Sequence, residues 1–264
     1  MNQQTDMYVD AHKLPDAVRS KTNVIKLLYI IRILDVAIPA VIILLELILN
    51  WDEKFDTFVL GLLIVLAIPG YFLIDKLYKT KENELREFMG QNVIASVLAE
   101  RMQIMEYQPN GCINENVLRN SNIFQHYDRL EGSEYIHGVY RGAEFCFCNL
   151  KLFDEFRSPD GDNDCREIFG GWFMLLPLKK PLAGYVKQQS LERMMSLEGR
   201  VKMDFSGNMA YIAVNDVKEL FDIGGKNKSA GNVIEESRRR YREDLIKMLS
   251  VLDVVNLNSS LFRS

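Results

Sequence analysis

Two apolar stretches near the amino terminus decide the architecture of this chain: residues 33–49 read ILDVAIPAVIILLELIL, and residues 57–74 read TFVLGLLIVLAIPGYFLI. A helix that crosses the ~30 Å hydrocarbon core of a bilayer needs roughly 20 mostly apolar residues. Two runs of nearly this length, joined by one short turn at residues 50–56, are uncommon among soluble helices. The stretches predict a transmembrane helical hairpin, and a buried hairpin in a soluble core is the alternative.

Charged residues lie in or beside the first run: Arg32, Asp35 and Glu46. Arg32 and Asp35 are three residues apart and can pair on one helix face. Glu46 lies near the other end of the run, from which its carboxylate can reach the headgroups. We expect these charges to be solvated at the membrane edges. Because intramembrane charges are functional candidates, a conduction or proton path is the alternative.

Lysine and arginine set the predicted orientation of the hairpin. The short loop is mainly acidic, whereas basic residues flank both runs: Lys13, Arg19, Lys21 and Lys26 before the first, and Lys76, Lys79, Lys81 and Arg86 after the second. The positive-inside rule places such flanks in the cytoplasm. The sequence therefore predicts a multi-pass protein of the inner (cytoplasmic) membrane, with both termini cytoplasmic and the lipid bilayer as a partner.

The chain divides into three predicted parts: a polar segment at residues 1–22, the hairpin at 23–76, and a cytoplasmic α+β domain at 77–264. Amphipathic spacing predicts helices over residues 77–105, 115–124 and 232–255. Asn114 is in the N-cap position of the second of these helices. A short helix over 190–197 and a Gly- and Lys-rich linker over 222–231 complete the helical and loop assignments.

Strands are predicted where Tyr, Phe, Val and Ile gather between turn residues: residues 134–140, 143–151, 166–176, 182–189, 200–205 and 209–214. Arg141-Gly142 and Ser206-Gly207-Asn208 are typical of tight hairpin turns. The predicted fold class is an α+β membrane protein, with the hairpin followed by a mostly antiparallel sheet or partial barrel flanked by helices.

Several short motifs carry a family resemblance: Ser121-Asn122-Ile123-Phe124, then Glu131-Gly132-Ser133-Glu134-Tyr135-Ile136-His137-Gly138, then Phe145-Cys146-Phe147, Phe169-Gly170-Gly171-Trp172-Phe173 and the Gly-Tyr-Val of residues 184–186. Their order resembles a bacterial membrane-protein family known as domain-of-unknown-function three-one-three-seven, over about residues 85–221. The resemblance implies two membrane helices followed by a mixed α/β cytoplasmic domain, and it implies no activity. The family's extra strand-rich stretch after residue 188 is missing here.

Basic residues supply the candidate ligand-binding or lipid-binding side chains. Lys226 and Lys228 lie in the Gly-rich linker before a helix, where backbone amides can hold a phosphate, although the spacing fits neither the P-loop nor the dinucleotide fingerprint. The densest positive cluster follows on the helix: Arg238, Arg239, Arg240 and Arg242. A flexible linker and a solvated helix surface are the alternatives for these two groups.

Metal and cofactor signals are weak. Cys146 and Cys148 lie on one face of a predicted strand and could bind zinc with Cys112, Cys165 or His137, but the paired spacings of structural zinc sites are absent. The alternating Asp160, Asp162 and Asp164 lack the Gly and Glu that a calcium loop places at its sixth and twelfth positions. We therefore predict no metal, no cofactor and no catalytic residue.

The functional prediction is a non-enzymatic membrane-anchored protein whose α+β domain binds a protein or lipid partner, or another copy of the chain. The alternative is a ligand-gated membrane effector, in which the β-rich domain senses a small anionic molecule and the hairpin oligomerises. A membrane-bound enzyme of unknown reaction is the second alternative. The net charge of −4 argues against general nucleic-acid binding, which depends on clustered positive charge.

Overall fold

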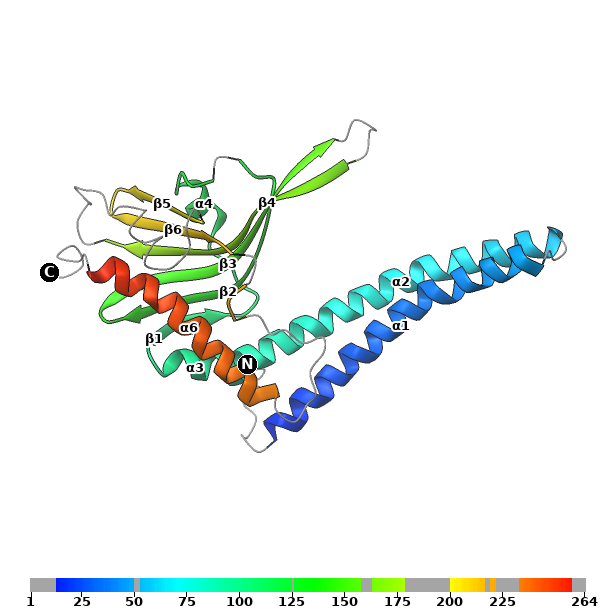
Figure 1. Ribbon diagram of the computed structural model, residues 1–264, viewed down its shortest axis with the longest axis horizontal. Coiled ribbons are helices and arrows are strands. Elements are labelled where there is room, and N and C mark those ends of the chain that lie inside the picture. Colours follow the sequence, from blue (N-terminus) through cyan, green and yellow to red (C-terminus); the bar gives the residue numbers. More distant parts are fainter. Residues whose placement is uncertain are drawn as a thin grey trace, which may run out of the picture. The chain divides into compact units, whose positions relative to one another are not determined.

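The structure, a computed structural model, describes residues 13–49, 53–124, 126–157, 163–178, 200–216, 219–221 and 233–257 (Figure 1). The chain forms two compact units: a helical unit that ends at Phe88, and an α+β unit whose described sheet and helices begin at Met89. Three predicted elements fall outside the described residues, namely the strand over 182–189, the helix over 190–197 and the linker over 222–231.

The helical unit is a hairpin of two long helices, α1 (Leu14–Leu49) and α2 (Glu53–Met89), which run side by side (Figure 1). Each helix contains one internal proline, Pro39 in α1 and Pro69 in α2. Ring and charge contacts join the helices, since the ring centroids of Tyr29 and Tyr78 lie 6.4 Å apart. The prediction of two antiparallel helices from the two apolar stretches is therefore confirmed at the level of secondary structure.

The predicted membrane role of this hairpin is wrong. Within the described part of the chain, no helix is both long enough and apolar enough to cross a bilayer. Arg32 and Asp35 interrupt the apolar residues of α1, and Asp75, Lys76 and Lys79 follow those of α2. This finding contradicts the transmembrane fold class, the multi-pass inner-membrane location and the membrane hairpin that the family resemblance implied, and the topology predicted for both termini rested on that hairpin.

The helix predicted over residues 77–105 is interrupted well before its expected end. A π-helical turn, η1 (Gly90–Ile94), follows α2, and a short helix, α3 (Ala95–Ala99), follows η1. The chain then becomes extended as β1 (Gln103–Gln108), which pairs with the next strand. Met105 continued the apolar spacing of a helix, but hydrogen bonding to a distant strand outweighed this local pattern.

The α+β unit is built on one six-stranded antiparallel sheet with the strand order β1-β2-β3-β4-β6-β5. After β1 the strands are β2 (Arg129–Tyr140), β3 (Ala143–Arg157), β4 (Asn163–Pro177), β5 (Val201–Ser206) and β6 (Met209–Asn215). The predicted antiparallel sheet and five of its strands are confirmed. Positive φ angles of 51° at Arg141 and 82° at Gly142 give the tight turn between β2 and β3.

One face of the sheet packs against α6 (Val233–Leu257), which lies across it in Figure 1. A chain of aromatic contacts crosses this interface. Phe147 lies 5.9 Å from Trp172 and 6.1 Å from Phe221, and Phe221 lies 6.4 Å from Tyr241 of α6, measured between ring centroids. All four rings are fully or almost fully buried. The amphipathic helix predicted over residues 232–255 is confirmed.

The opposite face packs against α4 (Glu115–Arg119) and the chain around it. Asn114 caps this helix as predicted, since its side chain accepts a hydrogen bond of 2.9 Å from the Asn116 amide. The helix is shorter than the predicted span of 115–124. Its core with the sheet is aliphatic and aromatic and includes Ile113, Leu118, Phe124, Cys148, Leu150, Phe169 and Phe173. The sheet is thus buried on both faces, and Cys148 lies within the α4 core.

Candidate functional site

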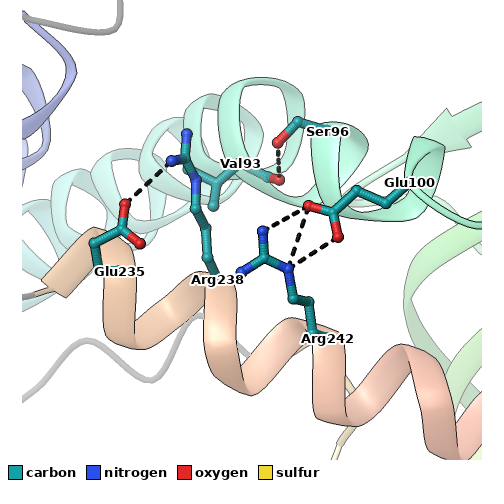
Figure 2. Close-up of polar contacts among 6 residues, drawn as sticks. All are labelled: Val93, Ser96, Glu100, Glu235, Arg238 and Arg242. Atoms are coloured by element: carbon teal, nitrogen blue, oxygen red, sulfur yellow. Dashed lines mark hydrogen bonds and ion pairs between the residues drawn. The ribbon is translucent and has the colours of Figure 1, made fainter.

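Two of the predicted arginines on α6 already hold carboxylates (Figure 2). Arg242 donates through Nη2 to Oε1 of Glu100 at 2.7 Å and through Nε to Oε2 at 2.9 Å. These hydrogen bonds lower the pKa of Glu100 below its ordinary value. Arg238 lies 3.2 Å from Glu235 on the preceding turn of α6. The charges of both arginines are compensated by the protein itself.

Arg239 and Arg240 are the other two predicted arginines of α6. The Arg240 guanidinium lies 5.3 Å from the centre of the Tyr241 ring, a cation–π contact with the neighbouring residue. Arg239 is exposed on α6. Lys226 and Lys228 lie outside the described residues. The arginines of α6 therefore chiefly contact other groups of the protein. Arg238 and Arg242 each pair with a carboxylate, and Arg240 contacts an aromatic ring.

A second site joins two cysteines that are distant in sequence. Cys112 lies between β1 and α4, Cys148 lies in β3, and their sulfur atoms are 3.7 Å apart. Cys148 is completely buried, and Cys112 is half-buried. A side chain at Gly132 would overlap the Cys112 sulfur, so the Cys112 side chain lies directly over the β2 backbone. Sequence spacing gave no signal for this contact, because 36 residues separate the two positions.

The two thiols differ in their acidity. The contact with the Cys148 thiol lowers the pKa of the Cys112 thiol, whereas burial raises the pKa of the Cys148 thiol. Burial also raises the pKa of Cys146, whose sulfur accepts a hydrogen bond of 3.7 Å from the Tyr135 hydroxyl. A thiolate is the nucleophilic form of cysteine. Cys112 therefore combines partial exposure with the more acidic thiol.

The cysteines do not assemble the zinc site that was weighed from sequence. Cys146 and Cys148 share a face of β3 as expected, yet Cys165 is exposed on β4. Across the described part of the chain, the only three potential ligands within 4.8 Å of one another are His126, Asp128 and Asp154. All three are at least partly exposed, and Arg166 binds Asp154 at 3.1 Å. Asp160 and Asp162 of the acidic loop lie outside the described residues.

Two of the three predicted charges of the hairpin, Arg32 and Asp35, contact the other helix. Arg32 binds Asp75 at 3.1 Å and donates a hydrogen bond of 2.6 Å to the Tyr71 hydroxyl, so its partners are on α2 and it does not pair with Asp35 as expected. The Asp35 carboxylate lies against Gly70, where an added Cβ would be 3.2 Å from Oδ1. The side chain of Glu46 lies outside the described part of the structure.

A hydrogen bond from Lys79, 2.8 Å from Asp75, lowers the pKa of Asp75, and the charge of Arg32 adds to the effect. Asp75 is only 17% exposed, so these charges are partly shielded from water. The seam between α1 and α2 is therefore polar at the level of Arg32 and Asp75.

Among the described residues, the hairpin exposes many apolar side chains. Six residues of α1 are spaced alternately three and four apart and are 38–57% exposed: Val24, Leu27, Ile31, Leu34, Ile38 and Val41. This alternation is the spacing of a coiled-coil seam, which places all six on one helix face. We call these six residues the α1 apolar row. On α2, Ile68, Phe72, Leu73 and Leu77 are 52–67% exposed.

Comparisons with protein families, curated proteins and solved structures give no match to this chain. The family resemblance drawn from the short motifs stays a prediction, and the function has to be argued from the geometry alone.

Proposed function

We propose that this chain is a non-enzymatic interaction protein whose helical hairpin binds the hairpin of a second copy, so that α+β units are brought together in an assembly. The α1 apolar row is the observation that carries this proposal. Six large aliphatic side chains, each more than one-third exposed, follow one heptad seam on the outside of a folded hairpin. Exposed apolar surfaces of this kind mark interaction sites.

A second copy fits the row because the row is complementary to itself. Two-fold symmetric interfaces bring the same patch of both subunits together, and alternating three- and four-residue spacing allows the side chains of two such helices to interdigitate. No charged residue lies among the six positions of the row. A charged partner surface would therefore find no opposite charge on the row to pair with. An equally apolar heptad seam would bury its own apolar side chains against the row.

The apolar area that the described hairpin exposes is on the scale of a standard interface. The six residues of the row and the four exposed residues of α2 each leave on the order of 80 Å² of apolar surface in contact with water. Together they offer roughly 800 Å², which is the area that one partner contributes to an interface of standard size. The polar seam of Arg32 and Asp75 stays inside each hairpin and does not need to be opened.

The effector alternative has less support from the described residues. A sensor for a small anionic molecule needs cationic groups that are available to the ligand, and Arg238 and Arg242 already bind carboxylates. An enzyme needs a reacting group placed against a substrate site, and the strongest pKa shifts among the described residues belong to Cys148 and Tyr135, whose pKa values burial raises. The exposed apolar surface of the hairpin is larger than either of these sites, and no described residue covers it.

The proposal is tested by measuring the mass of the purified full-length chain with light scattering after size-exclusion chromatography. Proteins with interfaces of this size associate at micromolar concentration or tighter, so a range of about 1–100 µM is suitable. We expect the wild-type chain to run at a multiple of its 30.5 kDa mass. The double variant Ile31→Glu/Leu34→Glu should run as a single chain, because burying four unpaired carboxylates in the pair weakens association at least 100-fold.

Ile246→Glu is the matched control. Ile246 is 53% exposed on α6, where it belongs to no apolar row, so this variant should keep the wild-type mass. Circular dichroism shows whether each variant keeps its helices. A wild-type chain that stays a monomer throughout the range would overturn the proposal, including the case in which it binds only some other molecule. An unchanged mass of the double variant would overturn the assignment to the row.

A further inference from the structure

The contact between Cys112 and Cys148 is the strongest feature that self-association leaves unused. The two sulfur atoms lie 3.7 Å apart, although the residues come from a loop and a strand that are 36 positions apart. A disulfide bond is ~2.05 Å long, so the sulfurs need to approach by roughly 1.7 Å. A movement of this size is within the reach of side-chain rotation.

The loop that carries Cys112 is fixed on both sides. Before Cys112, the Glu134 amide donates a hydrogen bond of 2.9 Å to the Pro109 carbonyl. After it, Ile113 is only 4% exposed within the α4 core, and Asn114 caps α4. The missing side chain of Gly132 leaves the space that the Cys112 side chain occupies. The sulfur contact is therefore held by the surrounding backbone and is not the result of one free rotamer.

Exposure separates the two thiols into different roles. Cys112 is half-buried and is the more accessible of the two residues, while Cys148 is completely buried. The contact with the Cys148 thiol also lowers the pKa of Cys112, which favours the reactive thiolate there. A reactive sulfur with a second sulfur in contact is the arrangement in which oxidation ends in a disulfide rather than in higher sulfur oxides.

We propose that Cys112 and Cys148 form a redox-active dithiol that is converted to an intramolecular disulfide by hydrogen peroxide. The Cys112 sulfur attacks one peroxide oxygen, the O–O bond breaks, and one water leaves as Cys112 becomes a sulfenic acid. The Cys148 sulfur then attacks the Cys112 sulfur, the S–O bond breaks, and the Cys148 proton leaves with the hydroxyl as a second water. Two thiols lose two electrons and two protons, and one peroxide becomes two waters.

The other two cysteines are internal controls. The Cys146 sulfur is contacted by the Tyr135 hydroxyl, and burial raises the pKa of its thiol. Cys165 is exposed on β4, and its described contact is with Arg129 at 3.5 Å. Peroxide can modify Cys165, but the structure gives it no neighbouring sulfur among the described residues. We therefore expect neither Cys146 nor Cys165 to be needed for the disulfide.

To test this, the folded and reduced full-length chain is treated with hydrogen peroxide, and the remaining thiols are then blocked. The peptides are mapped by mass spectrometry without reduction. We expect a cross-linked peptide pair containing Cys112 and Cys148, lighter by two hydrogens, that disappears on reduction. In the Cys165→Ser chain the free-thiol count should fall from three to one. Cys146→Ser should still form the cross-link, and Cys112→Ser should leave Cys148 as a free thiol.

Cys112→Ser replaces a half-buried side chain with one of similar size, and circular dichroism checks that it folds. The wild-type peptide map does not depend on any variant. Oxidation that stops at Cys165, or a Cys112 that ends as a sulfinic acid while Cys148 stays reduced, would overturn the proposal. The cross-link forms within one chain, so its presence or absence is independent of whether the hairpins associate.

Discussion

Helices α1 and α6 distribute their residues in opposite ways. In α6 the apolar side chains of Tyr241, Leu245 and Leu249 are at most 3% exposed, and charged residues cover the outer face. In α1 the charged Arg32 lies against α2, and the α1 apolar row faces outward. A helix gains stability when its apolar face is covered. The sheet of the same unit covers the apolar face of α6, whereas our proposal gives the α1 apolar row a second copy of the chain as its partner.

The two helices also differ in their ion pairs. Arg242 and Glu100 are 49% and 41% exposed, so water screens the contact between them. Arg32 and Asp75 are 31% and 17% exposed and lie between the helices of the hairpin. The pair of Arg32 and Asp75 joins α1 to α2 at one level of the hairpin, and single polar contacts of this kind set the register of the helices in coiled coils. In the hairpin, Arg32 pairs with Asp75 of the other helix, while the α1 apolar row stays exposed.

The largest expected effect tests the buried face of α6. Leu245 and Ile246 are consecutive, but they are 1% and 53% exposed. Leu245→Ala should lower the free energy of unfolding of the α+β unit by about 2–5 kcal/mol, because it leaves a cavity in the core. Ile246→Ala should change it by less than about 0.5 kcal/mol. Urea unfolding followed by tryptophan fluorescence measures both, since Trp172 is buried on the same face.

Equal effects of the two alanine variants would contradict the division of α6 into a buried and an exposed face. A large loss in Ile246→Ala alone would show that a partner covers the outer face of α6. In either case the comparison with α1 would no longer hold.

A smaller effect is expected from two glycines, one in each unit. A side chain at Gly171 would overlap the backbone carbonyl of Val214 on the neighbouring strand, so Gly171→Ala should cost about 1–3 kcal/mol. At Gly70 the nearest atom is a carboxylate oxygen of Asp35, 3.2 Å away, and alanine favours helix by about 1 kcal/mol. Gly70→Ala should therefore change stability by less than about 1 kcal/mol.

Circular dichroism at the helix wavelength and tryptophan fluorescence can be followed together in both glycine variants. A loss at Gly70→Ala as large as that at Gly171→Ala would mean that α1 and α2 are packed as tightly as the sheet. The hairpin would then resemble a closed core, and its exposed surface would be less available to a partner.

The elements that sequence predicted well are those whose signal is local. The alternation of β3 and β4, the turn at Arg141 and Gly142, and the 3.6-residue period of α6 each lie within one segment. The cap at Asn114 needs only the next two residues. β1 was missed because its extended form depends on pairing with β2, where Tyr107 lies opposite Ile136, and no local pattern encodes that partner.

The candidate site residues also show that contacts between distant positions could not be predicted from the sequence. Arg32 was placed beside Asp35 because the two are close in sequence, but its partners Tyr71 and Asp75 are about forty residues away. The Cys112–Cys148 contact also joins distant positions. The assignment of the apolar stretches to a membrane placed Arg32 and Asp35 at the membrane edge, whereas Arg32 pairs with Asp75 on α2. Residue type could be read from the sequence, whereas the partner of each residue required the fold.

The smallest expected effect is on the pH dependence of stability, which depends on the carboxylates of the two ion pairs. The pKa values of Asp75 and Glu100 are both lowered in the folded chain, by hydrogen bonds from Lys79 and Arg242 respectively. Each contact stabilises the fold fully above the unfolded carboxyl pKa of about 4, and this contribution is lost as pH falls through the lower folded pKa. Asp75→Asn and Glu100→Gln should remove these acid-dependent contributions, so that unfolding midpoints fall less between about pH 5 and pH 2 than in the wild type. Because Asp75 is the less exposed carboxylate, its substitution should flatten the acid limb more. If Glu100→Gln reduced the acid-induced fall of the unfolding midpoint more than Asp75→Asn, the contact of Arg242 with Glu100 would be the stronger one. The ion pair of α6 would then contribute more to stability than the ion pair of the hairpin.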